Sequence, residues 1–168
     1  MSTDSGETAA HMHGFDLRWI SFGSPSAIVT SMALIAGLDA ATSAKTTVLA
    51  SLLIIGLADN LTDSLSVHIY QESERLAGAR AFRTTVANFV ARFTVSLSFI
   101  ALFLALPTGT SVAVCLVWGV FLLSLLSYLL AKEREVSAVL EIVKHVGVAA
   151  AVIAMSGAIG FEVRALMG

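Results

Sequence analysis

Two aspartates stand inside an apolar segment of the chain, where a carboxylate is costly. The segment of residues 56–74 reads GLADNLTDSLSVHIYQESE and contains Asp59 and Asp63. Counted from Thr47 at 1.5 Å per helical residue, Asp59 lies about 18 Å along the helix and Asp63 about 24 Å. The hydrocarbon core of a bilayer is about 30 Å thick, so we expect Asp59 near its middle. Ionisable side chains at that depth mark ion or substrate pathways.

The helical phase of this segment collects its polar side chains into stripes. At 100° per residue, one stripe about 80° wide holds five of them: Asp59, Asp63, Ser66, Tyr70 and Glu74. A second stripe beside it holds Asn60, Ser64 and Gln71, and His68 and Glu72 lie further round. Oxygen donors on one stripe suit a hard or borderline divalent cation, such as Mn²⁺ or Fe²⁺, with which a proton can compete. For the hydroxyl residues taken singly, hydrogen bonding between packed helices is the alternative.

The next apolar segment carries an arginine, Arg92, and such a residue has to be paired or face a cavity. With the link between the two helices centred near residue 78, antiparallel packing places Arg92 level with Leu65. We therefore predict an ion pair between Arg92 and Asp63, with Asn88 nearer the cytoplasmic surface. Asp59 then remains the unpaired acid and the expected carrier of a cation or proton.

These residues belong to a chain with the composition of a membrane protein. Of its 168 residues, 57% are hydrophobic and 13% are charged, and the mean hydropathy is +0.86. Soluble domains are about 45–50% apolar and about 25% charged. The net charge of -2 gives no electrostatic case for a nucleic-acid partner. We predict an all-α integral membrane protein with five transmembrane helices: a disordered N-terminal tail (1–14) and a single transmembrane domain (15–168).

The expected spans follow the apolar runs of the sequence. They cover residues 25–41, 47 to beyond 69, 82–106, 112–131 and 136–161. One side of the membrane receives six basic residues: Arg18, Arg75, Arg80, Arg83, Lys132 and Arg134. The other side receives Lys45 and Arg164. Because basic residues favour the cytoplasm, we predict a cytoplasmic N-terminus and an outside C-terminus, in a bacterial or archaeal cell membrane.

The first span is rich in small residues. Ala33, Gly37 and Ala41 form a small-xxx-small ridge of the kind that lets two helices approach closely. We predict a homodimer through this helix, surrounded by membrane lipid.

Three fragments of the chain resemble the vacuolar iron transporter family, over about residues 22–165. They are FGSPSAIVTSMALIAGLDAA, VLASLLIIGLADNLTDSLSVHIYQESE and EIVKHVGVAAAVIAMSGAIG. The resemblance implies a dimer of five-span protomers that moves Fe²⁺ or Mn²⁺ out of the cytosol, commonly against protons.

The chain departs from the family at its ligand positions. The aspartate of the family's first helix falls at Ser26, the methionine of its Ser-Met pair at Val67, and the glutamate of its Glu-Tyr pair at Gln71. The family's cytosolic metal-binding insert is also missing. We expect the metal ligands instead at Asp59, Asp63, His68, Glu72 and Glu74. The expected transport pathway adds Ser26, Asn60, Ser66, Tyr70, Asn88 and Arg92.

These observations predict a divalent-cation exporter, with Fe²⁺ or Mn²⁺ as the transported ion and proton antiport as one form of coupling. Two alternatives stay open: a non-transporting structural or regulatory membrane subunit with the same fold, and a transporter of another cationic solute. We expect no permanently bound cofactor. We also expect no enzyme, because the sequence has no His-box, nucleophile–base pair or cofactor motif.

Overall fold

The computed structural model describes residues 23–42, 44–73 and 78–167 of the chain. Every regular element within these residues is an α-helix, and five helices are long and apolar enough to cross a membrane. They are α2 (Ser24–Thr42), α3 (Lys45–Ser73), α4 (Gly78–Ala105), α5 (Thr108–Glu133) and α6 (Ala138–Met167). The prediction of five apolar helices is thus confirmed. The tail predicted for residues 1–14 lies outside the described residues.

The turns between the last three helices have local causes. Pro107 precedes α5 in an extended conformation, with φ -59° and ψ 147°, and proline cannot continue α4. After α5, Glu135 adopts a positive φ of 54°, which reverses the chain. Helix α6 therefore begins at Ala138 instead of the predicted residue 136.

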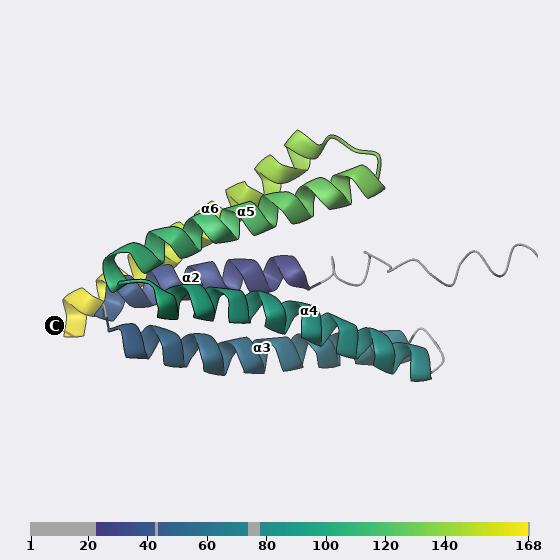
Figure 1. Cartoon of the computed structure of the whole chain (residues 1–168), viewed down its shortest axis with the longest axis horizontal. Coiled ribbons are helices and arrows are strands. Elements are labelled where there is room, and N and C mark those ends of the chain that lie inside the picture. Colours follow the sequence, from purple (N-terminus) through teal and green to yellow (C-terminus); the bar gives the residue numbers. More distant parts are fainter. Residues whose placement is uncertain (1–22, 43, 74–77, 168) are drawn as a thin grey trace, which may run out of the picture.

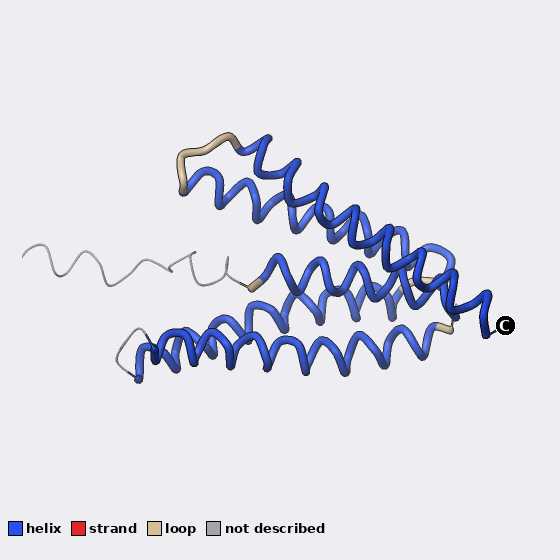
Figure 2. The backbone as a smooth tube through the Cα atoms, turned by 180° about the vertical axis from the view of Figure 1, so that it is seen from behind, coloured by secondary structure: helices blue, strands red, loops and turns tan. Residues whose placement is uncertain are grey.

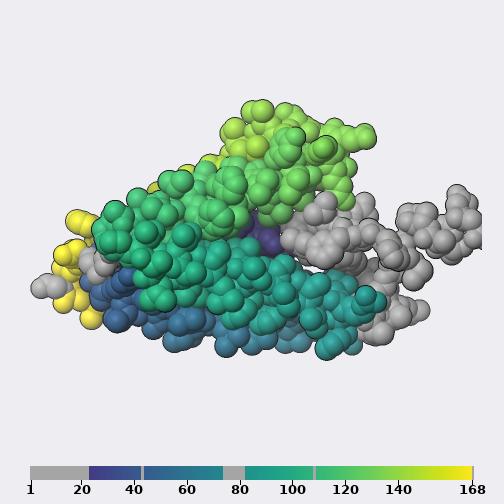
Figure 3. Space-filling model, in the orientation of Figure 1, coloured from purple at the N-terminus to yellow at the C-terminus, as the bar shows by residue number. Residues whose placement is uncertain are grey.

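The helices form two antiparallel hairpins, α3–α4 and α5–α6, and α2 packs against all four of their helices (Figure 1). The view from behind shows the same arrangement, with the two hairpins spreading apart at the end where α3 ends, α4 begins and the α5–α6 link lies (Figure 2). In the space-filling view, α4 and α5 touch near the Pro107 turn and separate towards their other ends (Figure 3).

The apolar core lies towards the end of the bundle where α3 and α5 begin and α4 ends. It contains Val48 and Leu52 of α3, Phe99 and Phe103 of α4, and Cys115 of α5, all buried. The same end is tied by a side chain, because Lys45 Nζ donates hydrogen bonds to the carbonyl oxygens of Leu104 and Leu106 at 3.0 and 2.7 Å. The buried residues of α3 and α4 are polar in the other half of the hairpin.

The small residues of α2 pack against α6 of the same chain. Gly37 lies against Ser156, whose hydroxyl donates a hydrogen bond to the Ala33 carbonyl at 2.6 Å. Gly160 lies against the carbonyl of Gly37. Helix α6 thus supplies small residues that match the ridge predicted for a second copy. The ridge of small residues on α2 that we predicted to contact a second copy is therefore covered by α6 of the same chain. The homodimer stays a prediction.

Candidate functional site

Polar side chains line the contact between α3 and α4 in the half of the hairpin next to its link. Helix α4 contributes a buried residue from each of four successive turns, and α3 contributes the second stripe of the sequence. We call these residues the polar seam: Thr84, Asn88, Arg92 and Ser96 from α4, and Asn60, Ser64 and Gln71 from α3. The spacing of four residues on α4 places its members on one face of the helix.

Arg92 is the centre of this seam and is fully buried. Its Nη2 lies 2.8 Å from Asp59 Oδ2, and its Nη1 lies 3.1 Å from Asp63 Oδ2. Its Nε donates to Asn60 Oδ1 at 3.1 Å, and Nη1 also donates to the carbonyl of Gly23, which directly precedes α2. The guanidinium therefore joins three helices through its fork of donors.

The two aspartates differ from Arg92 in their exposure. The Asp59 and Asp63 side chains are 39% and 36% exposed, whereas the Arg92 side chain is 0% exposed. With both carboxylates ionised, these three residues carry one negative charge more than positive charge. Each carboxylate is thus held by Arg92 on one side and exposed at the surface of the chain on the other.

Amide side chains hold the cluster in place. Asn60 Nδ2 donates to Ser96 Oγ at 3.2 Å, while Asn88 Nδ2 lies 3.4 Å from both Asp63 Oδ2 and Ser64 Oγ. Asn88 thus contacts Asp63 directly, whereas Asn60 is joined to the aspartates through Arg92.

The ion pair predicted between Arg92 and Asp63 is confirmed, but the prediction that Asp59 stays unpaired is wrong. Helix α4 begins at Gly78, before the predicted start at residue 82, and this moves the centre of the link. Arg92 consequently lies level with Asn60 instead of Leu65, about one turn deeper along α3. From this position its planar guanidinium contacts both carboxylates.

Gly23 is required by the close approach of α2 to the cluster. A Cβ atom at this position would lie 2.7 Å from Arg92 Cδ and 2.8 Å from Asn88 Oδ1. Real Cβ atoms do not approach other atoms so closely, so glycine allows the Gly23 carbonyl to reach the guanidinium.

Two other predicted metal ligands, His68 and Glu72, do not join this cluster. His68 Nε2 lies 3.4 Å from Glu72 Oε1, and His68 Nδ1 lies 3.2 Å from Thr85 Oγ1, so these residues form a local contact nearer the link. Glu74 lies outside the described residues. Within the part of the chain that the structure describes, no group of three or more His, Cys, Asp or Glu side chains is close enough to hold a metal ion.

Three predicted pathway residues lie on exposed surfaces. Ser66 is exposed, and its hydroxyl donates to the carbonyl of Thr62 on its own helix at 2.9 Å. Tyr70 is 61% exposed, and Ser26 is exposed on α2. The structure does not bring these side chains to the Arg92 cluster.

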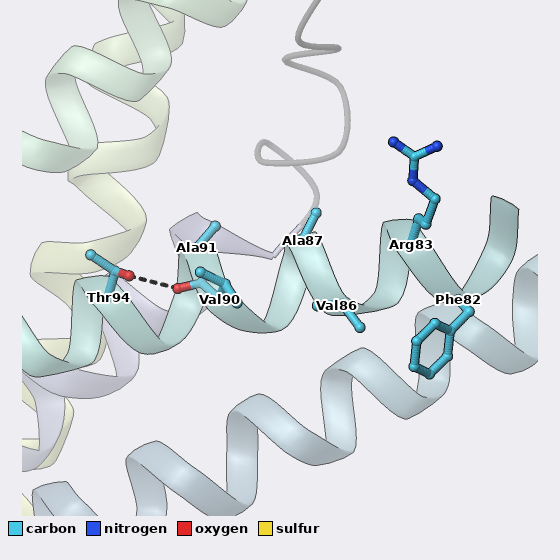
Figure 4. A pocket seen from close by; sticks show the side chains of 7 residues that line it. All are labelled: Phe82, Arg83, Val86, Ala87, Val90, Ala91 and Thr94. Atoms are coloured by element: carbon cyan, nitrogen blue, oxygen red, sulfur yellow. Dashed lines mark hydrogen bonds between the residues drawn. The ribbon is translucent and has the colours of Figure 1, made fainter. Parts of the chain in front are cut away.

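Two open cavities run along the outer surface of the α3–α4 hairpin, and neither is lined by Asp59 or Asp63. The larger, of about 660 Å³, follows α4 from Phe82 to Thr94 (Figure 4). Thr94 in this groove donates to the carbonyl of Val90 on its own helix at 2.8 Å. The other, of about 350 Å³, includes His68 among mainly apolar residues. Both grooves are mainly apolar, as expected of a surface in contact with lipid.

Sequence reasoning missed Gly23, Thr84 and Ser96 as parts of this region. The spacing of Thr84, Asn88, Arg92 and Ser96 is visible in the sequence as a polar residue every four positions. This pattern could have predicted the polar face of α4. The Gly23 carbonyl has no such signal, because it meets Arg92 only through the tertiary packing of α2.

A scan of protein-family models, a search of curated proteins and a search of solved structures return no match to this chain. The resemblance to the vacuolar iron transporter family therefore stays a prediction.

Proposed function

We propose that the protein is a membrane cation transporter in which Asp59 and Asp63 bind the transported ion. The observation that carries the proposal is the Arg92 cluster: two half-exposed carboxylates, held by one buried guanidinium, midway along apolar helices. Ionisable groups at membrane depth are costly and are retained mainly on ion and substrate pathways.

Fe²⁺ and Mn²⁺ are the ions that we propose as cargo. The cluster offers carboxylate and amide oxygens, which suit a hard or borderline divalent cation. A divalent ion that binds both carboxylates has to compete with Arg92, which contacts each of them at about 3 Å. Arg92 would keep its bonds to Asn60 and Gly23 when the carboxylates turn to the ion.

The excess negative charge supports coupling to protons. When no cation is bound, one proton would neutralise the cluster, and a loaded cation would displace it. The distribution of basic residues supports an N-terminus in the cytoplasm and an outside C-terminus, and hence export from the cytosol. A homodimer in a bacterial or archaeal cell membrane is part of the same proposal.

The test is cation flux into proteoliposomes, with Fe²⁺ and Mn²⁺ measured separately and a pH dye inside. Replacing both aspartates, as Asp59→Asn with Asp63→Asn, should lower flux by at least about tenfold, because neutral amides do not offset a divalent charge. Glu162→Gln, at an exposed acid on α6, is the matched control and should keep full flux. Full flux in the double variant would refute the assignment.

A structural or regulatory membrane subunit is the second function that an observation favours. Arg92 contacts α3 and the residue that precedes α2, as a residue that only locks helices together would. No described group of three acidic, histidine or cysteine side chains could hold a metal. Under this alternative the wild-type protein transports neither Fe²⁺ nor Mn²⁺. Substitution of Arg92 then changes only the stability of the protein. Flux of an organic cation in the same vesicles would instead identify another cationic solute as cargo.

A further inference from the structure

Two amide side chains of the polar seam have buried atoms without hydrogen-bond partners among the described residues. These atoms are Nε2 and Oε1 of Gln71 and Oδ1 of Asn88, in side chains of residues that are 1% and 2% exposed. A buried amide without a partner is costly, and native proteins usually satisfy such groups with ordered water. The seam thus has both the polar atoms and the need for internal water.

Gln71 and Asn88 lie between the link and the two aspartates. Gln71 is in the last turn of α3 and stands eleven positions after Asn60, a length of about 16 Å along the helix. Gln71, Ser64 and Asn60 fall within about 40° of one another around α3. Asn88 stands between them on α4, with its Nδ2 3.4 Å from Asp63 Oδ2.

The seam is closed at its deep end by the apolar core. Beyond Asn60 and Ser96, the buried residues on the two helices are Val48, Leu52, Phe99, Ile100 and Phe103. Packed apolar side chains offer water no hydrogen-bond partner. Water can therefore enter from the end of the hairpin near its link and not from the end near Pro107.

We infer that the polar seam holds ordered water molecules, which enter from the link end of the α3–α4 hairpin and hydrogen-bond to the side chains of Gln71 and Asn88. This hydration does not depend on the proposed function.

Silver ions test the hydration directly, because Ag⁺ is small and reacts with thiols in water-filled spaces. In a Cys115→Ala background, Gln71→Cys and Asn88→Cys should react with Ag⁺ added on the link side at least about tenfold faster than Leu52→Cys in the dry core. Thr94→Cys, on the exposed face of α4, is the matched control for a membrane-facing position. Thiols that remain are counted with a maleimide after unfolding.

The sidedness of the reaction decides the outcome. Reaction at Gln71 and Asn88 from the link side alone supports the inference, even if the protein transports no metal. Equal reaction from both sides, or a rate equal to that of Leu52→Cys, overturns it. Should Asn88→Cys fail to fold, Gln71→Cys alone carries the test, because Gln71 makes no described side-chain bond that the change would remove.

Discussion

Arg92→Met removes the guanidinium that joins α3 and α4 to the start of α2, and we expect it to destabilise the protein. Methionine is similar in length but apolar, so it fills the space and leaves Asp59, Asp63 and Asn60 without their partner. Removing one member of a buried ion pair costs about 3–5 kcal/mol. The Asp59 and Asp63 side chains are 39% and 36% exposed, so their carboxylates are only partly removed from solvent. We therefore expect a destabilisation at the lower end of this range, about 3 kcal/mol.

The charges can be separated from the packing by a mutant cycle. In a background with Asp59→Asn and Asp63→Asn, the cost of Arg92→Met should fall close to zero, because an arginine without counter-charges is itself costly at this depth. The coupling energy is then about 3 kcal/mol. The assay is the loss of helical circular dichroism as sodium dodecyl sulfate is added to the protein in mixed micelles.

Thr94→Val is the control for this cycle, since Thr94 is exposed on α4 and bonds its own helix. Arg92→Lys should give an intermediate loss, because an ammonium keeps the charge but not the planar fork that reaches two carboxylates. Equal costs of Arg92→Met in the wild-type and double-Asn backgrounds would refute the reasoning, since the contacts with the aspartates would then contribute nothing.

Three further changes have clear expected outcomes. Gly160→Ala should destabilise the protein by about 1–3 kcal/mol, because its methyl group meets the Gly37 carbonyl. Gly147→Ala, with open space around it on the same helix, should be neutral or stabilising by up to about 1 kcal/mol in that assay. Lys45→Met should cost about 1 kcal/mol, because it frees two carbonyls near the end of α4; no loss would mean that water caps them equally well.

The helices could be predicted because a membrane fixes the length of an apolar segment. All five helices are long and apolar enough to cross a membrane, and Pro107 marks one of the turns. The first and last residues of the helices were less predictable. The residues before Phe82 are small or charged and do not look like a membrane span, yet α4 begins at Gly78.

The ion pair between Arg92 and Asp63 could be predicted because an antiparallel hairpin limits which residues meet. Its register could not be fixed to better than one turn without the ends of the link, and Asp59 was assigned wrongly for that reason. The Gly23 contact and the packing of Gly37 against Gly160 depend on helices far apart in the sequence. No periodicity within one segment indicates which distant helix will cover it.

Direct binding of Mn²⁺ to the purified protein tests the central claim most directly. Electron paramagnetic resonance of the free ion counts the Mn²⁺ that is bound per chain. The account predicts saturable binding to the wild type that is lost in the variant with Asp59→Asn and Asp63→Asn and kept in Glu162→Gln. Equal binding by the double variant and the wild type would contradict the account, because the ion would then be held by other residues.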